Sequence, residues 1–133
     1  MKFISFDIGS KRIGVAVSDE SGIIAQPLLT LNVSDNLFTK IGEIIEAEKP
    51  QIAIFGIPRH QNGEEGEMSG QVREFAKGVK HEYNIEVDFE DESGTSIEAE
   101  RRLKLQGSDP RKIKEIVDAE AACVILESYL SRK

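Results

Sequence analysis

Three groups of acidic side chains occur where carboxylates could bind a metal together. They are Asp7, the adjacent pair Asp91 and Glu92, and Asp118. Carboxylate oxygens without an accompanying cysteine or histidine pattern select Mg²⁺ or Mn²⁺ over zinc. Two such ions, about 3.5–4 Å apart, can activate a water molecule and stabilise the leaving oxygen of a phosphodiester. The chemistry that these residues predict is therefore metal-dependent hydrolysis of a phosphodiester bond.

Each acid also has an ordinary structural explanation, which the sequence leaves open. Asp7 lies in an apolar strand pattern, where a carboxylate is unfavourable unless it is paired or binds a metal, but backbone amides of a turn could satisfy it. Asp91 and Glu92 follow the fifth predicted strand, at the carboxyl end where ligands gather in open α/β sheets, but they could equally complement the dipole of the next helix, with Thr95 or Ser96 as its N-cap. Asp118 projects at the edge of the apolar arc of the last predicted helix, where a shared metal would supply the partner that it needs.

Basic side chains accompany the acids at the first turn and in one later segment. Lys11 and Arg12 follow Gly9, directly after the first strand. Residues 99–114 contain six basic and two acidic residues, a net charge of +4 in a chain whose total is −7. This local basic stripe suits a protein that binds phosphates in one place, although a solvated helix face explains it equally well. The candidate nucleic-acid contacts are Lys11, Arg12, Arg59, Arg101 and Arg102.

The overall composition predicts one globular domain that spans residues 1–133. Hydrophobic residues make up 39% of the chain and charged residues 31%, which is ordinary for a soluble protein. The longest apolar stretches fall far short of the roughly 20 residues that cross a membrane. An acid and two bases at residues 7–12 argue against a signal peptide, and the single cysteine, Cys123, cannot form an internal disulfide. We therefore expect a cytoplasmic protein that does not associate with membranes.

The hydrophobic pattern predicts an α/β domain with five strands and four helices. The strands are expected at residues 2–8, 13–17, 23–31, 51–57 and 85–89, and the helices at residues 35–48, 68–83, 97–105 and 113–130. The first three strands are closely spaced and should form an antiparallel meander, with Pro27 indicating an edge position or a bulge. The continuous apolar run at residues 51–57 is typical of a central strand. Together with the later strand–helix–strand passages, these patterns predict a mixed five-stranded sheet flanked by helices.

Five sequence blocks carry a resemblance to a known family over nearly the whole chain. They are FDIGSKRIGVAVSD at residues 6–19, IFGIPRHQNGEEG at 54–66, VREFA at 72–76, DESGTS at 91–96 and VDAEAACVILESYL at 117–130. Through them the chain resembles the YqgF family, also called RuvX, of ribonuclease-H-like nucleases related to the RuvC Holliday-junction resolvases. The resemblance implies a ribonuclease-H-like fold and a divalent-metal site built from Asp7, Glu92 and Asp118. Asp91 would be a neighbour that assists, and the basic pair of the first turn would contact phosphate.

The chain departs from the family pattern at two places. Ser93 and Gly94 stand where the family usually has arginine and leucine after the paired acids. The loop at residues 60–63 reads His-Gln-Asn-Gly, where the family usually has Asn-Met-Asp-Gly. Arg101 or Arg102, on the following predicted helix, could replace the missing arginine. Because all three expected metal ligands are kept, we expect an active enzyme.

The resemblance makes the leading hypothesis a nuclease, a hydrolase that processes the 5′ end of pre-16S ribosomal RNA with Mg²⁺ or Mn²⁺ as cofactor. One alternative is a Holliday-junction resolvase that cuts branched DNA as a symmetric dimer, and another is a non-catalytic RNA-binding module of ribosome assembly. The segment at residues 6–10 is also similar to the phosphate loop of actin-like and sugar-kinase ATPases, but those enzymes need two lobes and 133 residues provide one. We expect a monomer or weak homodimer that binds structured RNA. The sequence does not separate RNA from DNA, because contacts to the 2′-hydroxyl cannot be identified in it.

Overall fold

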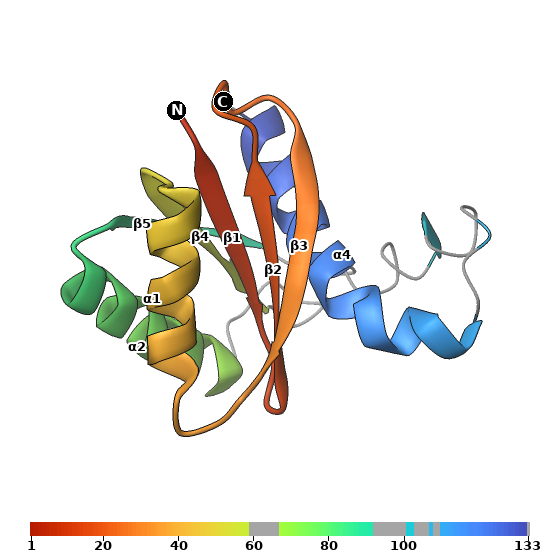
Figure 1. Ribbon diagram of the computed structural model, residues 1–133, viewed down its shortest axis with the longest axis horizontal. Coiled ribbons are helices and arrows are strands. Elements are labelled where there is room, and N and C mark those ends of the chain that lie inside the picture. The colour runs from red at the N-terminus through yellow and green to blue at the C-terminus, as the bar shows by residue number, and fades with distance from the viewer. Residues whose placement is uncertain (59–66, 92–100, 103–106, 108–109, 133) are drawn as a thin grey trace.

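The computed structural model is a five-stranded sheet with helices on both faces (Figure 1). The strands are β1 (Phe3–Ile8), β2 (Arg12–Ser18), β3 (Ala25–Asn32), β4 (Ile52–Ile57) and β5 (Glu86–Asp91), and the helices are α1 (Leu37–Glu48), α2 (Glu67–Tyr83) and α4 (Pro110–Ser131). The structure describes residues 1–58, 67–91, 101–102, 107 and 110–132, with the backbone alone at residues 67 and 110–115. Most of the helix predicted at residues 97–105, and residues 59–66 of the loop predicted at 59–67, lie outside the described residues, while Glu67 already belongs to α2.

The sheet has the order β3-β2-β1-β4-β5 and combines both kinds of strand pairing. The first three strands form the expected antiparallel meander, while β4 runs parallel to both β1 and β5. All six residues of β4 are buried, as the continuous apolar run predicts for a central strand. The pairing of β2 with the edge strand β3 shifts its register between Val15 and Ala16, beside Pro27. The predicted mixed five-stranded sheet, with its edge position and bulge at Pro27, is confirmed.

The third strand begins two residues later than the sequence pattern predicts. β3 starts at Ala25, whereas Ile23 and Ile24 are 75% and 59% exposed. The carboxylate of Asp19 accepts hydrogen bonds from the backbone amides of both isoleucines, at 2.8 and 3.0 Å, and holds them in the loop that precedes β3. These bonds lower the pKa of Asp19 below its usual value. The prediction for residues 23–24 is wrong because a side-chain acceptor competes with the strand ladder for these amides.

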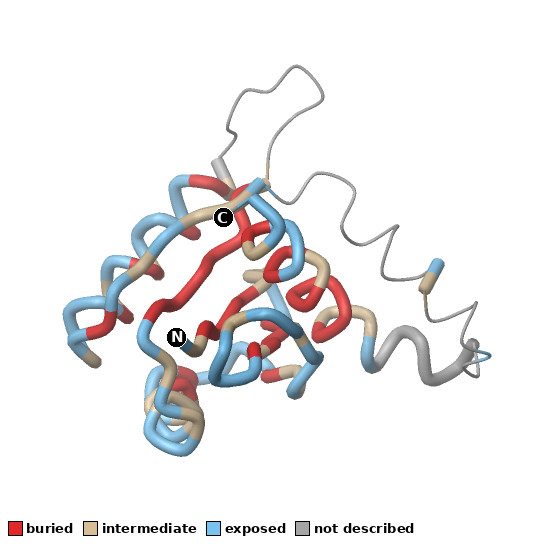
Figure 2. Tube along the Cα trace, turned by 90° about the horizontal axis from the view of Figure 1, so that it is seen from above, coloured by how far each residue is buried: buried red, intermediate tan, exposed pale blue. Residues whose placement is uncertain are grey.

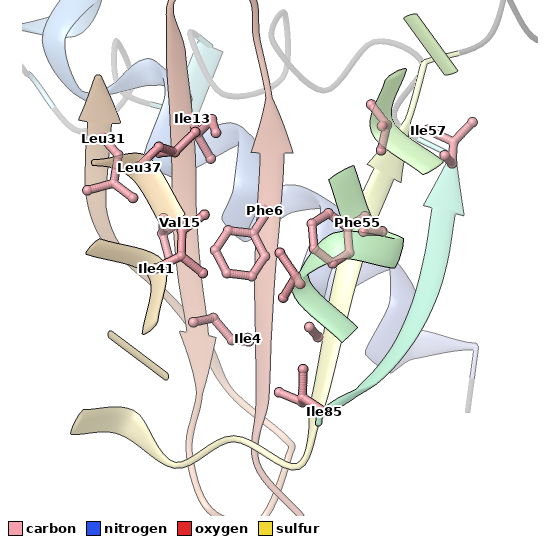
Figure 3. Packing of buried hydrophobic residues seen from close by; sticks show 14 residues of the cluster. Ile4, Phe6, Ile13, Val15, Leu31, Leu37, Ile41, Phe55, Ile57 and Ile85 are labelled. Carbon is pink, nitrogen blue, oxygen red and sulfur yellow. The ribbon is translucent and has the colours of Figure 1, made fainter. Parts of the chain in front are cut away.

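Two hydrophobic cores lie on opposite faces of the sheet. On the face covered by α1 and α2, Phe6 stacks on Phe55 with ring centroids 5.1 Å apart, among other apolar side chains (Figure 3). On the face covered by α4, Phe3 meets Tyr129 edge to face at 5.8 Å. Figure 2 shows the buried residues gathered in the sheet and on the helix sides that face it. Successive residues of β1 therefore point to different cores, which fixes the direction of each side chain along that strand.

The helix α4 begins three residues before the predicted start, at Pro110. Proline suits the first turn of a helix because that turn leaves its backbone amides without an intrahelical acceptor. Cys123 is buried in this helix, and burial raises the pKa of its thiol to about 12, as expected for a core residue. In the part of the chain that the structure describes, no helix is both long enough and apolar enough to cross a membrane.

Candidate active site

The turn between β1 and β2 places two basic residues beside the end of β1. The amide of Gly9 donates to the carbonyl oxygen of Arg12 at 2.9 Å. A Cβ atom at position 9 would lie 2.7 Å from the same oxygen, so the turn requires glycine there. Lys11 and Arg12 are both exposed. The hairpin therefore presents two cations close to Asp7.

Asp7 projects toward α4. In the antiparallel pair it lies opposite Gly14 of β2, and opposed residues share one face of the sheet. A methyl group on Gly14 would lie 1.8 Å from the carbonyl oxygen of Asp118, so α4 covers this face at this point. Two residues earlier on β1, the hydroxyl of Ser5 donates to the carbonyl oxygen of Ala122 in α4 at 2.7 Å, which supports the same direction. The half-buried Asp7 thus faces the helix that carries Asp118.

Asp118 is held both by its backbone and by its side chain. Because Gly14 has no side chain, the backbone of α4 comes into direct contact with β2 at this residue. The carboxylate Oδ2 of Asp118 accepts a hydrogen bond from Nε of Arg12 at 2.7 Å, within an ion pair. Sequence reasoning missed Gly14, although a glycine inside a strand pattern is a known sign of close backbone approach. The structure therefore brings Asp7, Arg12 and Asp118 together at the carboxyl end of β1.

The paired acids of β5 are placed differently. Asp91 is aligned with Ile57 of β4, which packs in the core beneath α1 and α2. Its side chain accordingly lies on the face opposite to the one from which Asp7 projects. There it lines a cavity of about 390 Å³, together with Arg73 and Phe89 among others. Glu92, the remaining predicted ligand, lies outside the described residues.

The chemistry of the two placed acids fits a divalent cation of the hard class. Asp7 and Asp118 supply carboxylate oxygens, the ligands that Mg²⁺ and Mn²⁺ prefer. Within the described ranges, no three His, Cys, Asp or Glu side chains gather closely enough to hold a metal ion. The two acids would therefore hold an ion together with a further ligand, for which Glu92 is the expected residue.

The predicted nucleic-acid contacts fall in three different settings. Arg102 forms ion pairs with Glu120 and Glu127 of α4, so it clamps its own segment to that helix. Burial raises the pKa of Glu120, and the charge of Arg102 opposes this shift. Arg101 is exposed, like the two basic residues of the first turn, and Arg59 lies outside the described residues. Charge alone could not distinguish a clamp of this kind from a phosphate contact.

A second group of polar side chains, which sequence reasoning did not identify, positions α4 on the sheet. We name it the β5–α4 cluster, and it consists of Asp88, Glu90, Ser128, Tyr129 and Arg132. The hydroxyl of Tyr129 donates to Asp88 at 2.7 Å, Nε of Arg132 donates to Oε1 of Glu90 at 2.6 Å, and Ser128 donates to Oε2 of Glu90 at 2.6 Å. Burial, followed by the bond to Asp88, raises the pKa of Tyr129 to about 12. The hydrogen-bond partners lie about forty residues apart in sequence, so no local sequence pattern predicts these contacts.

Comparison with solved structures identifies the class of fold. RuvC of Thermus thermophilus, in complex with a Holliday junction substrate, is similar with a TM-score of 0.62 and 15% identity, over 99% of this chain and 95% of that one. The Fowlpox virus resolvase, in complex with Holliday junction DNA, is similar with a TM-score of 0.62 and 16% identity, over 99% of this chain and 98% of that one. The predicted ribonuclease-H-like fold is therefore confirmed.

Comparison of sequences identifies the family. The sequence model of RuvX, described as Holliday junction resolvase, matches residues 1–132. A protein of Maridesulfovibrio salexigens is 38% identical over 134 residues, which cover 99% of each chain. A protein of Lactococcus lactis is 33% identical over 133 residues, 97% of this chain and 93% of its own. Both carry the name "Putative pre-16S rRNA nuclease". The chain belongs to the RuvX family of nucleases, as the sequence blocks predict.

Proposed function

We propose that this protein is a divalent-metal-dependent nuclease that hydrolyses phosphodiester bonds at the 5′ end of pre-16S ribosomal RNA. The observation that carries the proposal is the convergence of Asp7 and Asp118 on one face of the sheet, at the carboxyl end of β1. The names of the full-length relatives support this substrate. A small enzyme of this kind would act on structured RNA in the cytoplasm, as a monomer or weak homodimer.

The proposed division of labour follows from the placement of the side chains. Asp7, Asp118 and Glu92 would hold Mg²⁺ or Mn²⁺, whereas Asp91, predicted as an assisting neighbour, has its side chain on the opposite face of the sheet and would not bind this ion. When bound, the ion supplies a Lewis acid that activates water and stabilises the leaving oxygen. The half-buried setting of Asp7, against β2 and α4, keeps its carboxylate in a fixed position relative to the substrate phosphate.

Phosphate binding would be local, since the chain as a whole carries a net charge of −7. The exposed residues Lys11 and Arg12 lie beside the proposed metal ligands and would contact the scissile phosphate or its neighbours. Arg59 and Arg101 would contact further phosphates along the nucleic-acid strand. Arg102 would contribute indirectly, by holding its segment against α4.

A second candidate function is the resolution of branched DNA. The description of the matching family model as Holliday junction resolvase favours it. A resolvase cuts two strands symmetrically and would act as a stable dimer, whereas a processing nuclease has no such requirement. Measurement of the mass in solution, with and without a four-way junction, would therefore separate the two functions.

The test of the proposed function compares substrates and metal conditions. Labelled pre-16S RNA and a four-way DNA junction are incubated with the protein in Mg²⁺, Mn²⁺ or EDTA, beside Asp7→Asn and Asp118→Asn variants. We expect RNA cleavage that requires the metal and falls more than about 100-fold in either variant, a larger loss than removal of an outer-shell partner causes. The matched control is Glu86→Gln, an exposed acid at the opposite end of the sheet, which should cleave like the natural protein.

Three results would contradict the proposal in different ways. Cleavage that survives Asp7→Asn would exclude the metal site. Cleavage of the junction alone would favour the resolvase. Binding of RNA without cleavage of either substrate would favour a non-catalytic module of ribosome assembly.

A further inference from the structure

The ion pair between Arg12 and Asp118 joins two parts of the chain that are 106 residues apart in sequence. Each backbone is fixed independently of the pair. Arg12 closes the first turn through its carbonyl oxygen, which accepts from Gly9 at 2.9 Å. Asp118 lies directly over Gly14, where any side chain on the strand would collide with it. The hydrogen bond is therefore made between two rigid supports and holds the carboxylate in one orientation.

Both side chains of this ion pair have polar atoms that the hydrogen bond does not use. Nε of Arg12 donates to Oδ2 of Asp118, so Oδ1 is not part of this bond. The bond uses one of the five N–H donors of the guanidinium group. The side chain of Arg12 is 49% exposed, compared with 23% for Asp118, so the arginine lies on the solvent side of the acid. A substrate phosphate that approaches from solvent would meet the arginine first.

This ion pair contributes little to the stability of the fold, so we expect its main effect at the proposed metal site. Exposed ion pairs add little to stability, because solvent screens the attraction and ordering two long side chains opposes it. Hydrogen-bonded partners of metal-ligating carboxylates have a larger effect on metal affinity, since they fix the orientation of the ligand. The consequence of the contact is thus expected at Asp118 rather than in the stability of the protein.

Building on the proposed metal site, we propose that Arg12 is a positioning residue for the metal ligand Asp118 as well as a phosphate contact. Its Nε orients the carboxylate and leaves Oδ1 as the oxygen for the cation, while its remaining donors face the phosphate. Arginine suits both tasks because its planar fork can bind two acidic groups at once, whereas lysine offers a point charge on a flexible stem. Lys11, one residue earlier in the same turn, would contact phosphate alone.

Mn²⁺ binding to the full chain, measured by calorimetric titration without nucleic acid, separates the two roles. We expect Arg12→Gln to weaken Mn²⁺ binding about 10-fold, the lower end of the range for lost outer-shell partners. Arg12→Lys should recover part of that loss. Lys11→Gln, the matched control, should leave Mn²⁺ affinity unchanged, and the melting temperature should stay close to that of the natural protein in all three variants. In RNA-binding titrations, Lys11→Gln and Arg12→Gln should each lower the salt slope by about one.

The outcomes distinguish this inference from the metal site on which it rests. If Asp7→Asn abolishes Mn²⁺ binding but Arg12→Gln leaves it unchanged, the metal site stands and the positioning role is wrong. Tighter binding by Arg12→Gln would also overturn the inference, because Arg12 would then compete with the cation for Asp118. Mn²⁺ binding that is undetectable, or that survives Asp7→Asn, would overturn the metal site itself.

Discussion

Two groups of acids lie where the sheet contacts α4, and their carboxylates are held in different ways. In the β5–α4 cluster, both carboxylate oxygens of Glu90 accept hydrogen bonds, and its side chain is only 11% exposed. At the other group, Asp118 accepts from a half-exposed arginine and lies over a strand that has no side chain at Gly14. A carboxylate enclosed by its donors has a structural role. Asp118 faces a second acid and uses only Oδ2 in its ion pair, so it retains an oxygen that can bind a ligand.

Among the variants that test this comparison, Gly14→Ala is expected to change stability and cleavage the most. The added methyl group would lie 1.8 Å from the carbonyl oxygen of Asp118, so α4 must move away from β2. We expect a loss of about 3 kcal/mol in the free energy of unfolding, at the upper end for overpacking. Cleavage at a temperature where the variant is folded should also fall, because Asp118 leaves its position beside Asp7. Denaturant titration and cleavage assays measure the two effects.

A matched glycine on a helix provides the control. Gly70 lies in α2, and a Cβ atom there would have no described atom within 4 Å. Gly70→Ala should raise stability by about 0.5–1 kcal/mol, because alanine restricts the unfolded chain and favours the helix. If Gly14→Ala were as stable as the natural protein, the close contact between α4 and β2 would be refuted.

A smaller effect is expected in the β5–α4 cluster from Tyr129→Phe. Loss of the hydrogen bond to Asp88 should lower the free energy of unfolding by about 1 kcal/mol at neutral pH. Mn²⁺ binding should be unchanged, because the cluster has a structural role. A large loss of Mn²⁺ affinity in this variant would remove the distinction between the two groups of acids.

The raised pKa of Tyr129 predicts the direction in which the stability of the protein changes with pH. Folding raises the pKa of Tyr129 from its ordinary value of 10.0 to about 12, so the folded state retains the phenolic proton at a pH where the unfolded state loses it. The resulting stability is fully present below pH 10 and disappears as the pH rises toward 12. Urea titrations at pH 8 and 11 should show a steeper loss for the natural protein than for Tyr129→Phe. Parallel losses would contradict the shift.

Local sequence patterns predicted most of the fold because burial and strand position determine which residues occur in each segment. The apolar run of β4 reflects burial on both faces, and Pro27 reflects an edge strand whose ladder tolerates a missing donor. The pattern failed at residues 23–24, where the carboxylate of Asp19 takes the backbone amides. Side-chain acceptors of this kind do not alter the hydrophobic period, so the period cannot reveal them.

The candidate site was harder to predict because it depends on where α4 lies. The sequence indicated Asp7 and Asp118 separately, from their positions in a strand and on a helix. It could not indicate that Arg12 pairs with Asp118, or that Arg102 pairs with two acids of α4, since these contacts follow from packing. The glycine within β2 was a local sign of this packing.

The central claim is that Asp7 and Asp118 share a divalent cation. Its most direct test is a crystal of the protein grown with Mn²⁺, in which anomalous scattering locates the ion. We predict a peak about 2.0–2.2 Å from a carboxylate oxygen of each of these two residues, close to the distances of the hard octahedral cation Mg²⁺. A peak elsewhere, or no peak at these carboxylates in a protein that cleaves RNA with Mn²⁺, would contradict the claim.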